Sequence, residues 1–136
     1  YYAHPRNAFW PIISPLLDIG ADAPYSEKIT ALISSPIALW DVFQSCERNG
    51  SLDAMIRPDN YIINDFASLF SHHKQIRYVF FNGGTAERYF TRHVLVTRDF
   101  THLQQFRLPS TSPANAGLSF DQKRVIWHEK IQAALI

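Results

Sequence analysis

Cysteine is nearly absent from this sequence, with Cys46 the single one among 136 residues. One cysteine cannot form a disulfide within the chain, and no cysteine pair is available to hold zinc. The six histidines are scattered, and no two follow the His-x-x-x-His spacing that places two imidazoles on one helix face. The sequence therefore predicts no metal site, no cofactor and an intracellular compartment.

Strong charge of one sign and long apolar runs are also lacking. The formal net charge is +1, so overall charge does not indicate nucleic-acid binding, although cations gathered on one face remain compatible with it. No apolar run approaches membrane-spanning length, which predicts a protein without a membrane partner. What the chain does have is 46% hydrophobic and 14% aromatic residues, including ten Phe and three Trp. This content suits one globular domain over residues 1–136, in which most rings pack in the core.

The periodicity of apolar residues predicts helices alternating with strands. A helix is expected to begin near Phe9, with a restart at Ser14-Pro15 because proline fits only a first helical turn. Ser26 is expected to cap a second helix, with Ile29, Leu32 and Ile33 on one face. The further helices are predicted at 51–57, 64–73, after Gly83-Gly84, and from a capping box at 119–122 whose core face is Phe120, Trp127, Ile131 and Leu135.

Strands complete the pattern. They are predicted at 37–43, 77–82, 93–96 and 102–108, with a turn at 47–50. Strands separated by helices indicate parallel pairing, and hence an α/β three-layer sandwich around a mostly parallel sheet of three or four strands. Functional groups in such sheets gather where strand ends meet helix starts, which directs attention to 82–84 and 108–115.

Three segments, taken in order, carry a resemblance to a known family. They are YYAHPRNAFWP at 1–11; IALWDV at 37–42 followed by SCERNGSLD at 45–53 and NDF at 64–66; and FFNG at 80–83 with LPSTSPAN at 108–115. In this order they resemble the hypoxanthine-DNA glycosylases (DNA-deoxyinosine glycosylases), a branch of the uracil-DNA glycosylase superfamily. The resemblance implies a monomeric base-excision repair enzyme, cytoplasmic and associated with the nucleoid, that flips a deaminated base out of DNA and hydrolyses its N-glycosidic bond.

Two asparagines are the catalytic candidates that the resemblance implies. The carbonyl of Asn7 would accept a proton from the attacking water, and its NH₂ group would donate to base or phosphate. The alternative is that Asn7 only caps the following helix. Asn82 would read the O6/N1 edge of hypoxanthine, and its alternative is an Asn-Gly turn.

The segment 108–115 resembles the second motif of the superfamily. Ser110, Thr111 and Ser112 would bind DNA phosphate, whereas the alternative is a plain strand-to-helix connection. Many superfamily members have a histidine where this chain has Leu108. Leucine cannot stabilise a departing base by hydrogen bonding, which fits the hypoxanthine branch and counts against a uracil-type mechanism.

Five further positions are expected near the substrate. Trp40 and Asp41 lie where relatives build the base pocket, although Trp40 could be core and Asp41 could orient a loop. Tyr2 could stack on a base. His4 and Arg6 could contact phosphate, or could simply be solvated.

The superfamily's first motif, a strand ending in a loop with glycine and proline, is missing before Tyr1. We therefore expect a chain that begins after its first strand, with an exposed apolar groove or an unpaired strand edge where that strand belongs. No lysine lies in the three matching segments, so a Schiff-base lyase step has no evident nucleophile. The alternative functions are a uracil or mismatch glycosylase of the same fold, and a non-catalytic DNA-binding module.

Overall fold

The structure, a computed structural model, describes residues 6–20, 22–48, 56–95, 102–114 and 117–135. The chain divides into two compact units. The terminal unit consists of Tyr1–Leu39 and Pro109–Ile136, and the central unit is Trp40–Leu108. Each unit is described by itself, and their assembly into one domain stays a prediction.

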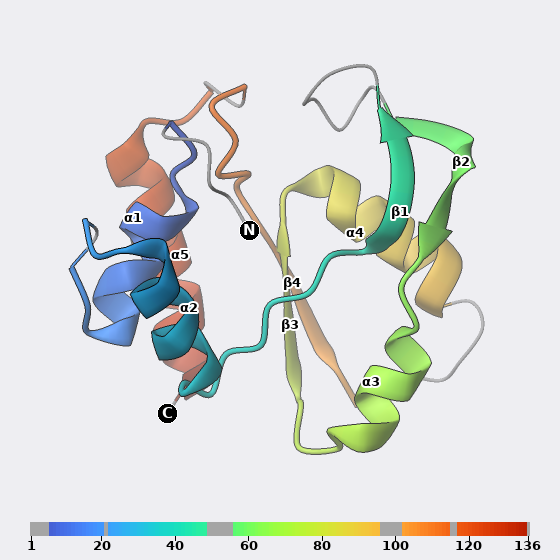
Figure 1. The fold of residues 1–136 in the computed structure, drawn as a ribbon, viewed down its shortest axis with the longest axis horizontal. Helices are drawn as coiled ribbons and strands as arrows, with labels where there is room; N and C mark the ends of the chain where they lie inside the picture. The colour runs from blue at the N-terminus through green and yellow to red at the C-terminus, as the bar shows by residue number, and fades with distance from the viewer. Residues whose placement is uncertain (1–5, 21, 49–55, 96–101, 115–116, 136) are drawn as a thin grey trace. The chain divides into compact units, whose positions relative to one another are not determined.

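The terminal unit is helical in its described residues (Figure 1). Its regular elements are α1 (Phe9–Ile13), the 3-10 helix η1 (Ser14–Leu17), α2 (Tyr25–Ile33) and α5 (Phe120–Leu135). The predicted restart at Ser14-Pro15 is confirmed, because α1 gives way there to η1, which ends at Asp18 with a left-handed φ of 60°. The predicted cap at Ser26 is wrong, because Ser26 lies inside α2, whose N-cap is Pro24 and whose first residue is Tyr25.

Aromatic packing holds α1 against α5. The Phe9 ring lies edge-on to Trp10 at 5.0 Å and to Trp127 of α5 at 6.0 Å between ring centroids. The imidazole Nε2 of His128 donates to the carbonyl oxygen of Ile12 at 2.7 Å, which adds a polar tie between the same two helices.

The predicted core face of α5 is confirmed only in its middle. Trp127 and Ile131 are buried, whereas Phe120 and Leu135 are 45% and 43% exposed. These two residues are the first and last of a 16-residue helix, while α1 has five residues. The ends of α5 therefore extend past the short helix that covers its middle. In α2, Leu32 is buried as predicted but Ile33 is 78% exposed.

The central unit contains a parallel pair of strands. Strand β3 (Tyr78–Asn82) pairs in register with β4 (Gln104–Leu108), from Tyr78 opposite Gln104 to Asn82 opposite Leu108. Both strands match predicted ones. Helix α3 (Phe66–His72) precedes β3 and α4 (Gly84–Phe90) follows it. The carboxylate of Asp65 accepts from the Ser68 backbone N–H at 3.0 Å, so the predicted start of α3 is confirmed.

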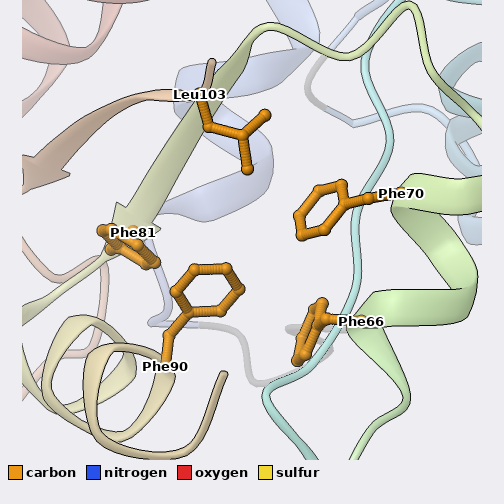
Figure 2. Close-up of a cluster of buried hydrophobic side chains, with 5 residues drawn as sticks. All are labelled: Phe66, Phe70, Phe81, Phe90 and Leu103. Atoms are coloured by element: carbon orange, nitrogen blue, oxygen red, sulfur yellow. The ribbon is translucent and has the colours of Figure 1, made fainter. Parts of the chain in front are cut away.

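Alternation along β3 gives the parallel pair two different faces. Phe81 belongs to a buried cluster in which Phe66, Phe70, Phe90 and Leu103 point toward one another (Figure 2). Phe80 lies on the other face, where its ring stacks on that of its strand partner Phe106 at 5.4 Å. The core of the central unit thus lies between α3, α4 and one face of the strand pair.

Four sequence-based predictions fail between residues 37 and 95. Residues 37–42 are not a strand, since β1 begins at Phe43 and runs to Arg48, pairing antiparallel with β2 (Ile56–Ile63). The predicted turn at 47–50 and the predicted helix at 51–57 are wrong over their described residues, because Glu47 and Arg48 belong to β1 while Ile56 and Arg57 belong to β2. The predicted strand at 93–96 is wrong over its described residues, where α4 continues as a π-helix, η3 (Thr91–Leu95).

The α/β class is confirmed, although the parallel sheet is smaller than expected. In the described residues it has two strands, and the antiparallel β1–β2 pair forms a sheet of its own. Within that part of the chain β3 and β4 pair only with each other. The unpaired strand edge expected beside a missing strand stays a prediction.

Candidate active site

The terminal unit contains a hollow that brings together two of the segments singled out in the sequence. It is open to solvent and has a volume of about 360 Å³, the lower end of the range for small-molecule sites. Its lining residues are Arg6, Asn7, Ala8, Pro11, Thr111, Ser112, Pro113, Leu118, Phe120 and Lys123.

Asn7 enters the hollow just before α1. Its side-chain oxygen Oδ1 accepts from the backbone N–H of Phe9 at 2.9 Å, which is the geometry of an Asx-turn. The bond satisfies the first N–H group of α1 from the position before the N-cap, which is Ala8 and makes no side-chain capping bond. The Asn7 side chain can still make further hydrogen bonds, because its carbonyl oxygen has a second lone pair and its NH₂ group is a separate donor.

A backbone hydrogen bond joins the two segments. The N–H of Ala8 donates to the carbonyl oxygen of Thr111 at 3.0 Å. Thr111 is only 1% exposed, so this bond is shielded from water and ties Asn7 firmly to the Ser-Thr-Ser loop, 110–112. The sequence places these residues more than a hundred positions apart, yet the fold makes them neighbours.

The Ser-Thr-Ser loop is shaped by its own hydroxyl groups. Ser110 Oγ accepts from the Ser112 N–H, and Ser112 Oγ accepts from the Ala114 N–H, both at 3.2 Å. The indole N–H of Trp127 donates to the Pro109 carbonyl at 2.9 Å, which fixes the start of the loop to α5. These bonds do not distinguish a phosphate-binding loop from a plain connection, because a serine that accepts such a bond still has a hydroxyl hydrogen to donate.

Lys123 is a lining residue that the sequence reasoning missed. It lies in the first turns of α5 and is only 5% exposed, and desolvation lowers the pKa of its amine. A lysine in an amphipathic helix is normally solvent-exposed, so the sequence carries no direct signal. The indirect signal is the capping box, which fixes where α5 begins. Ser119 Oγ accepts from the Gln122 N–H at 3.1 Å and Gln122 Oε1 accepts from the Ser119 N–H at 2.8 Å.

A second group of candidates lies in the central unit, at the carboxyl ends of β3 and β4. Asn82 is half-buried and pairs in register with Leu108, which is 1% exposed. The N–H of Gly83 donates to the carbonyl oxygens of both Phe81 and Leu108 at 3.0 Å. Gly83 has φ 93° and ψ 170°, a conformation that only glycine adopts readily. This turn directs the chain from β3 into α4.

Trp40 and Asp41 are held by the residues that follow β2. The Trp40 ring is 40% exposed and lies edge-on to Phe66 at 5.2 Å, so it is partly core and partly surface. The side-chain NH₂ of Asn64 donates to the Asp41 carbonyl at 2.6 Å, and its backbone N–H donates to that of Val42 at 2.9 Å. Asn64 therefore positions this loop, a role that the sequence did not reveal.

The remaining predicted site residues are near the start of the chain. Arg6 is exposed and lines the hollow, whereas Tyr2 and His4 lie outside the described residues. Among the residues that the structure describes, no group of three His, Cys, Asp or Glu side chains is placed to hold a metal ion. In the same part of the chain, no helix combines the length and apolar character needed to cross a membrane.

Comparison with known proteins decides the family. No protein-family model matches the chain. The solution NMR structure of a candidate uracil DNA glycosylase from Methanosarcina acetivorans superposes with a TM-score of 0.69 at 30% identity, covering 95% of this chain and 78% of that one. The chain belongs to the uracil-DNA glycosylase superfamily.

Within the uracil-DNA glycosylase superfamily, the predicted resemblance to the hypoxanthine branch is confirmed. A hypoxanthine DNA glycosylase from Methanosarcina acetivorans is 36% identical over 90 residues, which are 65% of this chain and 56% of that protein. Another from Methanosarcina barkeri is 35% identical over 92 residues, with the same two coverages. The chain thus spans about half the length of the curated relatives that it matches.

Proposed function

We propose that this protein is a monofunctional DNA glycosylase that hydrolyses the N-glycosidic bond of deoxyinosine, in base-excision repair of deaminated DNA. The supporting observation is the hydrogen bond between Ala8 and Thr111, which places Asn7 and the Ser-Thr-Ser loop on one hollow. A catalytic amide and a phosphate-binding loop must both contact the same flipped nucleotide, the amide at its sugar or base and the loop at its phosphate. Such a role would be carried out inside the cell, on the nucleoid.

The proposed reaction forms one bond and breaks another at the sugar. The oxygen of a water molecule bonds to C1′ while the bond from C1′ to N9 breaks, a water proton is released, and hypoxanthine leaves with the electron pair. Positive charge develops on the sugar and negative charge on the base. The free lone pair of Asn7 Oδ1 would accept from the water, since its other lone pair is directed to the Phe9 N–H.

The other candidate residues have supporting roles in this proposal. Arg6, Ser110, Thr111 and Ser112 would bind the phosphates next to the flipped nucleotide. Asn82 would read the base edge, and Trp40 and Asp41 would form part of the base pocket, together with Tyr2 and His4 as implied by the family resemblance. Leu108 is buried beside Asn82 and offers no hydrogen bond to a departing base, which favours hypoxanthine over uracil.

Cleavage of defined oligonucleotides tests the proposed function. Duplexes containing one deoxyinosine, deoxyuridine or deoxyxanthosine would be incubated with the protein and then treated with alkali to break abasic sites. We expect strand breaks at deoxyinosine first, and none before the alkali treatment. Preferential cleavage at deoxyuridine would favour the uracil-type alternative. Binding without cleavage of any of the three would leave the non-catalytic DNA-binding module as the function.

A further inference from the structure

Positive charge is concentrated in one part of the central unit. Residues 64–108 contain six lysines and arginines but three aspartates and glutamates, whereas the whole chain has a net charge of +1. Two of these three carboxylates already have partners, since Asp65 accepts from the Ser68 N–H and Glu87 pairs with Arg107 at 3.7 Å. A local excess of cations is the pattern that attracts a polyanion.

Two of these arginines gather around one aromatic ring, that of Tyr89. The guanidinium carbon of Arg88 lies 5.2 Å from the centroid of the Tyr89 ring, and that of Arg92 lies 5.6 Å from it. The imidazole of His93 stacks on the same ring, with the centroids 6.0 Å apart and an angle of 8° between the planes. We call these four residues the Tyr89 cluster. Three basic residues thus share one aromatic anchor.

The ring of the cluster is buried, whereas its two arginines are exposed. Tyr89 is 6% exposed, so the packing of α4 holds its ring in place. Arg88 and Arg92 are exposed and can therefore reach a ligand in solution. A cation over an aromatic face is attracted to the ring, which restricts each guanidinium group without removing it from water. Binding an anion therefore costs less conformational entropy than it would for two arginines without such an anchor.

The backbone that carries the cluster changes from α-helix to π-helix. Arg88 belongs to α4, whereas Arg92 and His93 belong to η3. Side chains four positions apart on a helix are neighbours, and two like charges at that spacing destabilise it. An anion bound to both arginines would offset this repulsion. Short π-helical turns that follow or interrupt an α-helix are also frequent at functional sites.

The hydrogen-bond donors of the two guanidinium groups suit a phosphodiester. The N–H groups of arginine lie in one plane as a fork that matches two phosphate oxygens. Contact with an aromatic ring does not use these donors, because the ring attracts the positive charge as a whole. Neither Arg88 nor Arg92 forms an ion pair with a residue that the structure describes. Both guanidinium groups can therefore bind phosphate through two parallel bonds.

We propose that the Tyr89 cluster binds the sugar–phosphate backbone of DNA, with Arg88 and Arg92 donating hydrogen bonds to phosphodiester oxygens while Tyr89 holds both guanidinium groups. The inference rests on the proposed function for the identity of the polyanion. It adds a DNA-binding surface on the central unit, outside the three segments that carry the family resemblance. The cluster binds phosphate and takes no part in bond cleavage.

The test is the salt dependence of affinity for a fluorescein-labelled duplex of undamaged DNA, measured by fluorescence anisotropy between about 50 and 200 mM salt. Each phosphate that a protein neutralises contributes about 0.9 to the slope of log affinity against log salt. The double variant Arg88→Gln, Arg92→Gln should reduce the slope by about 0.9 if both arginines bind one phosphate, and by about 1.8 if they bind two. The double lysine variant should keep the slope but bind more weakly at every salt concentration, because lysine cannot make two parallel bonds to phosphate.

Arg77→Gln is the matched control. Arg77 is also exposed, and its guanidinium carbon also lies over a tyrosine ring, 5.8 Å from the centroid of Tyr78. It precedes β3 and lies outside the Tyr89 cluster. Its replacement removes the same charge and should keep the wild-type slope. An equal reduction of the slope in Arg77→Gln would show that total charge, not the cluster, determines binding, and would overturn the proposal.

These outcomes separate the inference from the proposed function. Undamaged DNA is bound without chemistry, so a reduced slope in the double glutamine variant supports the surface even if the protein excises no base. An unchanged slope in that variant, together with cleavage of deoxyinosine DNA by the wild type, overturns the surface and leaves the glycosylase intact. Thermal unfolding shows whether each variant is folded. Should the double variant fail to fold, the two single glutamine variants replace it, and their summed reduction in slope is compared with the same values.

Discussion

In the proposed reaction, the Asn7 amide makes two interactions, one with the Phe9 N–H and one with the attacking water. Its Oδ1 already accepts from the Phe9 N–H, so any water that it also binds must approach along the remaining lone pair. The Asx-turn therefore limits the direction from which Asn7 can act, and it fixes the orientation of the amide. An amide fixed in this way has no reorganisation to undergo when charge develops, which is how preorganised polar groups accelerate reactions.

Replacement of Asn7 should separate the two interactions. We expect Asn7→Ala to slow single-turnover cleavage of deoxyinosine DNA by about two to three orders of magnitude and to lower the free energy of unfolding by about 1 kcal/mol. Asn7→Asp keeps the acceptor for the Phe9 N–H, so it should retain wild-type stability. Rates would be compared at saturating protein, with stability followed by thermal unfolding. Near-normal cleavage by a folded Asn7→Ala protein would reduce Asn7 to a cap and leave Asn82 as the better candidate.

At the scale of helices and strands, elements with local signals were predicted well. The capping box at Ser119, the cap at Asp65 and the aromatic strand at 78–82 each depend on residues within a few positions of one another. The same holds for Asn7, whose place at a helix start follows from the prolines after it. Local hydrogen bonding and periodicity were sufficient in these cases.

Elements that depend on a distant partner were not predictable in this way. Strand β2 contains Pro58, Asp59 and Asn60, which have low strand propensity. It is a strand because it pairs with β1, in a register that includes irregularities at Ser45 and Arg48. Residues 37–42 show the reverse case, since a strongly apolar segment with no pairing partner in the described residues remains irregular.

Gly83 offers a test of how the strand end is positioned. Its φ of 93° with ψ of 170° is strained for any residue with a Cβ, so Gly83→Ala should lower the free energy of unfolding by about 1–3 kcal/mol. Cleavage should fall as well, because Asn82 is displaced. Gly84→Ala is the matched control, since its Cβ would meet only the end of the flexible Arg107 side chain at 3.1 Å. We expect that variant to have wild-type stability in thermal unfolding. Equal effects of the two changes would show that the backbone at Gly83 is not constrained.

For the molecule as a whole, the family was identifiable from the sequence whereas the composition of the hollow was not. Motifs that follow one another in a fixed order can be read directly from the sequence. Lys123, in contrast, lines the hollow because α5 packs on α1 through Trp127 and His128. That packing joins residues separated by most of the chain. The three matching segments contain no lysine, and Lys123, which lies outside them, lines the hollow.

The buried cation also affects global stability, with a definite pH dependence. The pKa of Lys123 is lowered by desolvation from the ordinary value of 10.5, so the unfolded chain binds the proton more tightly than the folded one. The free-energy cost of holding the charged amine in the folded protein is fully present below the pKa of the folded state. This cost disappears as the pH rises toward the pKa of Lys123 in the unfolded chain. Lys123→Met should therefore be more stable than the wild type by about 1 kcal/mol near pH 7, with the difference shrinking toward pH 10.5.

Urea unfolding at a series of pH values measures this difference. Lys130→Met, at an exposed position of the same helix, should show no stabilisation at any pH. A gain in Lys123→Met that stays constant over the whole series would come from methionine packing rather than from removal of a charge.

The division of the chain into a continuous central unit and a terminal unit made from two separate segments has a consequence for biosynthesis. The four strands and both covering helices that the structure describes in the central unit, Trp40–Leu108, have been translated once residue 108 is reached. The terminal unit must wait for α5, since the bond from His128 to Ile12 closes a loop of 116 residues, a slow and entropically costly contact. The hollow is lined by residues from both segments. A ribosome-bound chain can thus contain the whole central unit while the hollow around Asn7 is still incomplete, because α5 contributes part of its lining.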